Sequence, residues 1–135
     1  MKFSKLVIFL STVIIVALSS CDCGFDYEFK IYNNTDNLLK VEYEMNAEFK
    51  TITVEPHMFI SLGTTAGYYC DCTDCQGSRI EAPDSSLYFI TGLKIFIQDS
   101  LECKTDFNNE YNWEFEPAKK LGLYVAFIDS SDFEL

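Results

Sequence analysis

Cysteine is the residue type in this chain with the clearest chemical potential, because three of its six cysteines lie within one short segment. Cys70, Cys72 and Cys75 are separated only by Asp71, Thr73 and Asp74. Such a cluster can form disulfides or bind a metal ion. In an oxidising compartment we expect disulfides. The candidates are Cys23, Cys70, Cys72, Cys75 and Cys103.

The disulfide pairing among these five cysteines stays open, but their spacing along the chain disfavours one of the possible pairs. Cys70 and Cys72 are too close along the chain to bridge each other easily. We favour two bridges and one free thiol, with the loop tied to Cys23 at one end and to Cys103 at the other. In this interpretation the cluster is a structural staple.

Metal binding is the alternative for the same cluster. Its Cys-x-Cys-x-x-Cys spacing suits a ligand set that Cys23, Cys103 or His57 could complete around zinc or copper(I). A second cysteine pair at zinc-ribbon spacing is missing, and the two aspartates inside the cluster raise the pKa of neighbouring thiols. We therefore expect no metal and no cofactor, and no thioredoxin-like activity.

Catalytic constellations are hard to assemble from the other residues. His57 is the only histidine, and it follows Pro56 in an expected turn. No phosphate-binding glycine loop and no Gly-x-Ser-x-Gly motif occurs. Glu114 and Glu116 could serve a glycosidase in principle, but in so acidic a chain they fit a solvated strand face better. We expect a protein that is not an enzyme, with a hydrolase as the weakest alternative.

The first 21 residues indicate where the protein acts. Lys2 and Lys5 precede an uncharged run at 6–18, and Leu18-Ser19-Ser20-Cys21 ends it. This arrangement resembles a bacterial lipoprotein signal. The resemblance implies cleavage before Cys21, whose sulfur would carry a diacylglycerol with chains such as palmitate. Plain secretion with cleavage after Ser19 remains open, and so does an uncleaved anchor, although the run would rise only about 20 Å as a helix.

The lipoprotein interpretation divides the chain into a signal peptide helix (1–20), the lipidated cysteine with a short tether (21–24) and a folded domain (25–135). The tether spans little more than about 10 Å, so the domain would sit on the membrane. Asp22 resembles an inner-membrane retention signal of enterobacteria, whereas acidic residues after the cysteine resemble surface-export signals of Bacteroidota. We expect a cell-envelope protein on the outer membrane, at its periplasmic or surface face.

The charge of the chain restricts its partners. The formal net charge is −11, and it becomes −13 when Lys2 and Lys5 leave with the signal peptide. Such a domain repels nucleic acid and anionic lipid headgroups. The acidity favours a cationic partner or divalent cations, or it serves solubility alone.

Alternating apolar and polar residues predict the fold of residues 25–135. Period-two patterns are typical of half-buried strands. They occur at 25–31, 39–45, 49–55, 57–62, 87–98 with a bend or bulge at Gly92, 111–116 and 121–127. About seven strands and no helical repeat predict an all-β, antiparallel two-sheet sandwich of immunoglobulin-like type, with a small barrel as the alternative.

Two connections receive specific predictions. The polar run 33–37 is typical of a turn, so we expect the first two strands to form a hairpin. Residues 29–56, with Asn-Asn-Thr-Asp between two strands and Thr-Ile-Thr-Val-Glu-Pro further on, resemble small lipoproteins of Bacteroidota, a resemblance that implies no particular activity.

The long connection 64–86 is the expected binding element. It holds the cysteine cluster with Tyr68, Tyr69 and Arg79, and tyrosine and arginine are typical of interface hot spots. We expect a binding or accessory module for an envelope protein or glycan. The alternatives are an exported metal-binding protein and a loop that only orders the crossover between the sheets.

Overall fold

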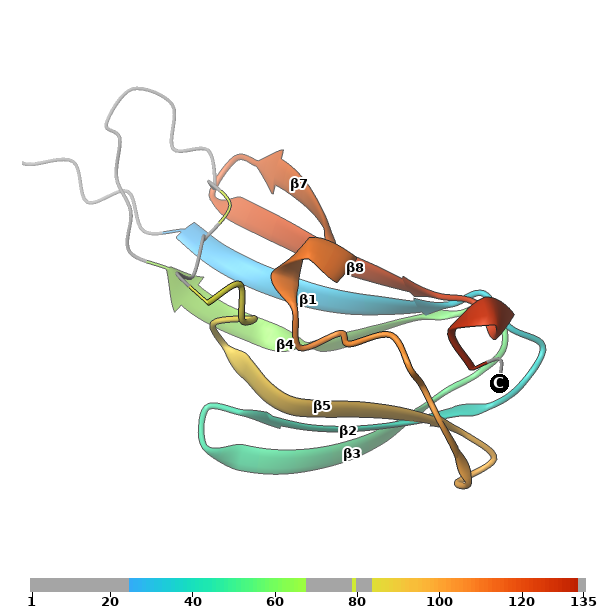
Figure 1. Cartoon of the computed structure of the whole chain (residues 1–135). Coiled ribbons are helices and arrows are strands. Elements are labelled where there is room, and N and C mark those ends of the chain that lie inside the picture. Colours follow the sequence, from blue (N-terminus) through green and yellow to red (C-terminus); the bar gives the residue numbers. More distant parts are fainter. Residues whose placement is uncertain (1–24, 68–78, 80–83, 134–135) are drawn as a thin grey trace, which may run out of the picture.

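Two four-stranded sheets pack face to face in the computed structural model, which describes residues 25–67, 79 and 84–133 (Figure 1). Sheet A has the order β4 (Phe59–Gly67), β1 (Phe25–Asn33), β8 (Leu121–Ile128), β7 (Glu114–Ala118). Sheet B has the order β3 (Glu48–Val54), β2 (Leu39–Met45), β5 (Ile90–Ile97), β6 (Leu101–Glu102). Two short 3-10 helices, η1 (Glu110–Asn112) and η2 (Ser130–Phe133), complete the described part.

The predicted all-β sandwich is confirmed. β2 has the predicted bounds, and its buried residues alternate with more exposed ones along its length. The described residues form eight strands, one more than expected, because the two-residue β6 is too short to show a pattern. One pair also departs from the antiparallel expectation, since β1 and β8 run parallel.

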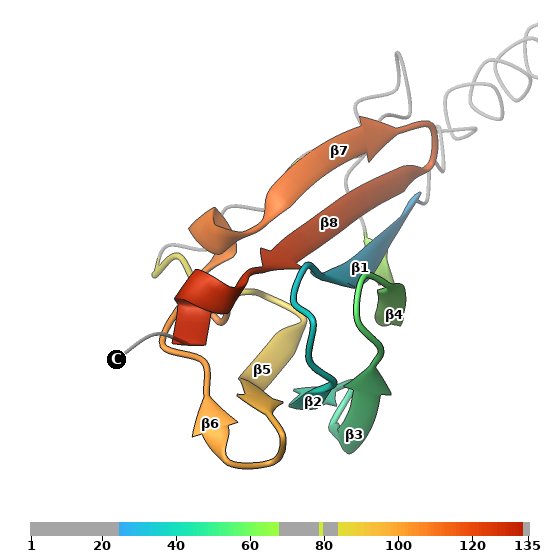
Figure 2. The same ribbon diagram turned by 90° about the vertical axis from the view of Figure 1, so that its right-hand side faces the viewer.

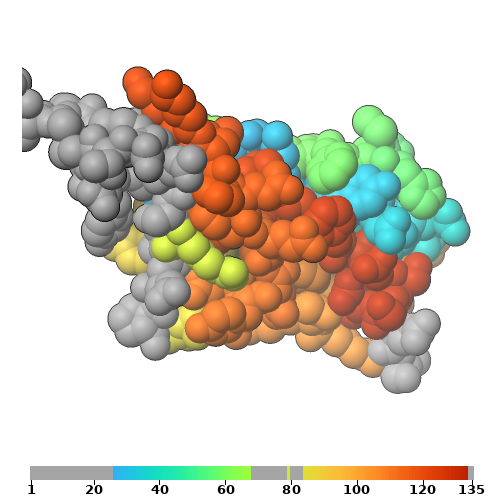
Figure 3. Space-filling view, turned by 90° about the horizontal axis from the view of Figure 1, so that it is seen from above, coloured from blue at the N-terminus to red at the C-terminus, as the bar shows by residue number. Residues whose placement is uncertain are grey.

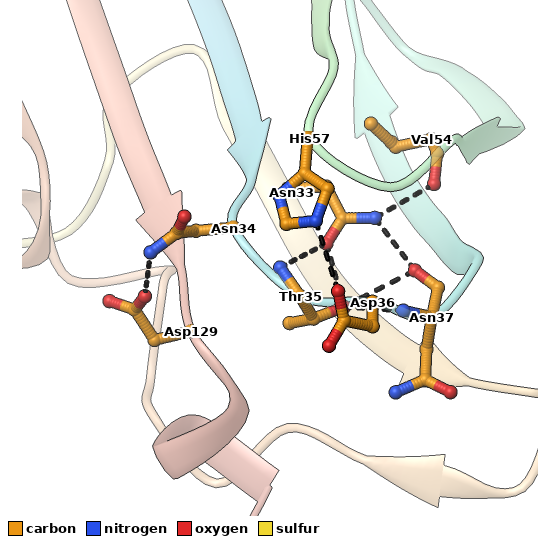
Figure 4. A network of polar contacts seen from close by, with 8 residues as sticks. All are labelled: Asn33, Asn34, Thr35, Asp36, Asn37, Val54, His57 and Asp129. Atoms are coloured by element: carbon orange, nitrogen blue, oxygen red, sulfur yellow. Dashed lines mark hydrogen bonds and ion pairs between the residues drawn. The ribbon is translucent and has the colours of Figure 1, made fainter.

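The predicted hairpin between the first two strands is wrong. β1 belongs to sheet A and β2 to sheet B, so residues 34–38 cross from one sheet to the other (Figure 2). The fully buried side chain of Asn33 holds this crossing. Its Nδ2 donates to the carbonyls of Asn37 (2.8 Å) and Val54 (3.1 Å), and its Oδ1 accepts from the backbone N–H and the hydroxyl of Thr35 (Figure 4). The polar run is a turn, as expected, but its hydrogen bonds tie the end of β1 to β3 of the other sheet.

The long connection is shorter than predicted at its start. Thr64 to Gly67 belong to β4, where they pair with β1. Ser86 forms an isolated bridge with Asn109, and regular pairing resumes only at Ile90. Gly92, with φ of 62°, lies where the pairing of β5 with β2 shifts register, which confirms the expected bulge.

In the last strand, β8 (Leu121–Ile128), the leucine side chains do not face the core; the alternating set of residues does. Tyr124, Ala126 and Ile128 are buried against sheet B, with Gly122 in the same row, whereas Leu123 and Phe127 lie on the outer face. Both alternating sets of β8 are apolar, so periodicity alone cannot assign them. A Cβ at Gly122 would lie 2.6 Å from the Tyr27 ring, so only glycine fits this inward position.

Candidate binding surface on the outer face of sheet A

The outer face of sheet A carries a cluster of apolar residues that remain partly exposed. Register places its residues in rows across β4, β1 and β8. Phe59, Tyr32 and Phe127 form one row at the end of β1 that leads into the 34–38 crossing. The next two rows place the aliphatic residues Val125 and Leu123 on β8, flanked by polar residues of β1 and β4.

The three rings of the first row contact one another. Their centroids are 4.5 Å apart for Tyr32 and Phe59, 5.8 Å for Tyr32 and Phe127, and 6.4 Å for Phe59 and Phe127. Phe59 remains 56% exposed and Phe127 40% exposed, so these rings pack on each other and still face solvent. We call Tyr32, Phe59 and Phe127 the aromatic row.

A hollow of about 400 Å³ adjoins the aromatic row. Its lining residues are Lys30, Phe59, Ser61, Glu116, Leu123, Val125 and Phe127. In the space-filling view from above, the cyan and green residues around the ends of β1 and β3 lie together at one end of the molecule (Figure 3). A hollow with an apolar floor and a few polar groups at its rim suits a small side chain or ligand.

An ion pair lies on this face. Lys30 Nζ lies 3.2 Å from Glu28 Oε2 on the same strand. Glu116 of β7 has no ion-pair partner among residues 25–67, 79 and 84–133. Glu116 is therefore the carboxylate at the rim of the hollow that has no ion-pair partner within the described ranges.

Arg79, predicted as a binding residue, has structural contacts. Its Nη2 donates to the carbonyls of Glu110 (2.6 Å) and Trp113 (3.3 Å), which lie at η1, and its guanidinium lies 5.8 Å from the ring centre of Tyr111. These hydrogen bonds hold the guanidinium in place. They favour the alternative that the connection 64–86 serves to order the crossover between the sheets. Tyr68 and Tyr69 lie outside the described residues.

Cys103 is a free thiol in the structure. It lies beyond β6, packs against the core, and its backbone N–H donates to the carbonyl of Ile95. Burial first of all, with smaller contributions from the charges of Asp132 and Glu102, raises the pKa of this thiol from 9.0 to about 11. A thiol that stays protonated is a poor partner for disulfide exchange and for metal. Cys103 forms no disulfide with another described residue. Cys21, Cys23, Cys70, Cys72 and Cys75 lie outside the described residues, so the disulfide staple stays a prediction.

The other candidates from sequence do not assemble a reactive centre. His57 Nε2 contacts Asp36 Oδ1 at 3.0 Å, and both side chains are largely exposed at the outside of the crossing (Figure 4). Glu114 and Glu116 lie on the exposed face of β7. Among the residues that the structure describes, no three acidic, histidine or cysteine side chains gather as metal ligands, and no helix is long and apolar enough to cross a membrane.

Comparison with known proteins adds no match: no family model, no curated protein and no solved structure is similar to this chain at a significant level. The surface itself was missed by sequence reasoning. The sequence feature that could have revealed it is the uninterrupted apolar run of β8. Because alternate residues of a strand point to opposite faces, such a run leaves apolar side chains on the outer face of the sheet.

Proposed function

We propose that this protein is a lipid-anchored binding module of the bacterial cell envelope, without catalytic activity, and that the outer face of sheet A is its recognition surface. The observation that carries the proposal is the exposed aromatic row beside the 400 Å³ hollow. Exposed apolar patches on soluble domains mark sites of interaction, and aromatic residues contribute most of the energy at such sites.

The position of this surface supports a partner in the aqueous space. The anchor at Cys21 would hold the domain through residues 22–24, next to the first residue of β1. Tyr32 lies seven residues further along the same strand, which is about 23 Å at the usual rise of a strand. The aromatic row would therefore lie at the end of β1 that is far from the anchor.

Photo-crosslinking in native envelopes tests the recognition surface. A photo-reactive amino acid replaces Ser61, which lines the hollow, and in a matched variant replaces Thr51, which is exposed on the outer face of sheet B. We expect one adduct at position 61 and none at position 51. Phe127→Ser should remove that adduct, whereas Phe49→Ser, at a phenylalanine of β3 that is 69% exposed, should leave it unchanged. Adducts at position 51, or adducts at 61 that survive Phe127→Ser, would contradict the proposal.

The anchor is tested separately. Intact mass analysis of the membrane-extracted protein should show a chain that begins at Cys21 and carries a diacylglyceryl group. Cys21→Ala should release the domain or stall its processing. An unmodified product that begins at Ser20 would refute the lipid anchor.

A further inference from the structure

The outer edge of β4, which pairs with no strand in the part of the chain that the structure describes, points to a class of partner. We propose that β4 binds an extended, positively charged peptide segment of a partner protein, which adds a fifth strand to sheet A beside the aromatic row. This inference rests on the proposed function, because it names the partner of the same surface.

The four sheet edges in the described part of the molecule differ in how they discourage strand addition. β7 carries Pro117 with two glutamates, β6 has two residues, and β3 includes the charged residues Glu48 and Lys50. Prolines, charges and short length are the usual protections of sheet edges. β4 has nine residues, Phe-Ile-Ser-Leu-Gly-Thr-Thr-Ala-Gly, with no charge and no proline.

At the start of β4, some backbone N–H and C=O groups point outward, away from β1. The N–H of Asn33 donates to the carbonyl of Met58, so these two residues form a hydrogen-bonded pair. Pairs alternate along an antiparallel ladder, so the next residue, Phe59, and then Ser61 turn their N–H and C=O groups away from β1. No strand among the described residues pairs with that side of β4.

The bulge in β4 limits the site to this segment. The register with β1 shifts between Phe29 and Lys30, next to Gly63 at φ of 143°. The regular stretch 59–61 precedes the shift and includes Phe59 of the aromatic row. Side chains of an added strand would alternate between the two faces, and those on the outer face would contact Phe59 and lie close to the hollow.

Charge favours a cationic peptide over a second copy of this chain. Glu55 precedes β4, Asp36 lies in the adjacent crossing, and Lys30, the nearby lysine of β1, is paired with Glu28. Two copies would each bring a net charge near −13 to the contact, which opposes association, whereas lysine or arginine side chains are attracted.

The probe is a capped nine-residue peptide of alternating lysine and valine, titrated against the purified chain and its variants. We expect saturable binding, with increased hydrogen-exchange protection of the Phe59 and Ser61 amides. The same peptide with backbone N-methyl groups keeps its charge but cannot donate hydrogen bonds, and it should bind at least about tenfold more weakly. A glutamate–valine peptide should lose binding to a similar or greater extent.

A matched pair of variants locates the contact. Ser61→Lys places a positive charge at the edge of β4, and Thr51→Lys adds the same charge to the exposed face of β3. Ser61→Lys should weaken binding by about fivefold or more, and Thr51→Lys by less than about twofold. Equal binding of the N-methylated peptide, or protection that appears at β3 or β7, would overturn strand addition at β4. Protection of the Phe59 and Ser61 amides that rises with protein concentration and without peptide would overturn the proposal in favour of self-association.

The two proposals fail separately. One outcome is that the peptide does not bind, but the crosslinked adduct at position 61 forms and is removed by Phe127→Ser. Strand addition is then refuted, and the recognition surface is retained. If both results are negative, neither the surface nor its edge is the binding site.

Discussion

Asn33→Ala should be among the most destabilising single substitutions at a polar residue in the described part of this protein. The Asn33 side chain is fully buried and makes four hydrogen bonds at the point where the chain leaves sheet A for sheet B. Alanine removes both the donor and the acceptor. The carbonyl of Val54 and the backbone N–H of Thr35, which belong to buried residues, each lose this partner.

The magnitude follows from those contacts. A typical hydrogen bond contributes about 0.5–1.5 kcal/mol to stability, and a buried group left without a partner costs about 1–3 kcal/mol. The bonds to Thr35 and Asn37 are local, so water can replace part of them in the variant. We therefore expect the free energy of unfolding to fall by about 3 kcal/mol, which lowers Tm by roughly 10–15 °C in a domain of about 110 residues.

Urea unfolding followed by tryptophan fluorescence measures this difference, because Trp113 is buried in the core. Asn34→Ala is the matched control: its exposed side chain makes one hydrogen bond, to Asp129, and its loss should cost less than about 1 kcal/mol. A loss below about 1 kcal/mol for Asn33→Ala, or one equal to that of Asn34→Ala, would refute the role of Asn33 in holding the crossing.

Three further predictions concern other buried contacts. Gly63→Ala should destabilise by about 1–3 kcal/mol in urea unfolding, because φ is 143° and a Cβ would lie 2.8 Å from Met45 Sδ. Tyr43→Phe should cost about 1 kcal/mol in the same assay, because it removes the 2.6 Å hydrogen bond to the Leu62 carbonyl. The raised pKa of Cys103 contributes stability that is complete below pH 9 and lost as pH rises toward about 11, so Cys103→Ala should show a shallower loss of stability over that range.

Each of these predictions has its own contrary result. Gly92→Ala introduces a Cβ that meets no atom within 4 Å, so a Gly63→Ala loss that does not exceed it would remove the argument from close approach to Met45. An unchanged unfolding midpoint for Tyr43→Phe would show that its hydroxyl is equally well solvated in the unfolded chain. Parallel pH curves for the native chain and Cys103→Ala would show that the thiol titrates alike in both states.

Most strands were predictable because a strand that buries one face alternates apolar and polar residues in its sequence. Leu39, Val41, Tyr43 and Met45 alternate with polar residues, and the structure buries all four. The same reasoning finds β8 but does not tell which of its faces is buried, because Leu121–Ile128 is apolar on both faces. The buried face depends on the tight fit of Gly122 against the Tyr27 ring. Such a contact arises between residues far apart in the chain, so no local pattern contains it.

The sheet topology and the candidate binding surface could not be predicted either, because both depend on contacts between residues far apart in the sequence. A polar turn such as 33–37 looks alike whether the chain folds back within one sheet or crosses to the next. The difference lies in the bond from Asn33 to Val54, 21 residues away. The aromatic row likewise forms only when the ends of β1 and β8 and the start of β4 meet.

The parallel pairing of β1 with β8 governs the order in which this protein can fold. Its two strands are separated by almost the whole described chain, as the 95-residue separation of the neighbouring Asn34 and Asp129 shows. β1 lies at the N-terminal end of the described chain and β8 near its C-terminal end, so β1 becomes available before the strand that completes its sheet, and closing so large a loop is slow. Until β8 arrives, one side of β1 stays open to pairing with any other chain, and this interval is when the protein is most exposed to aggregation.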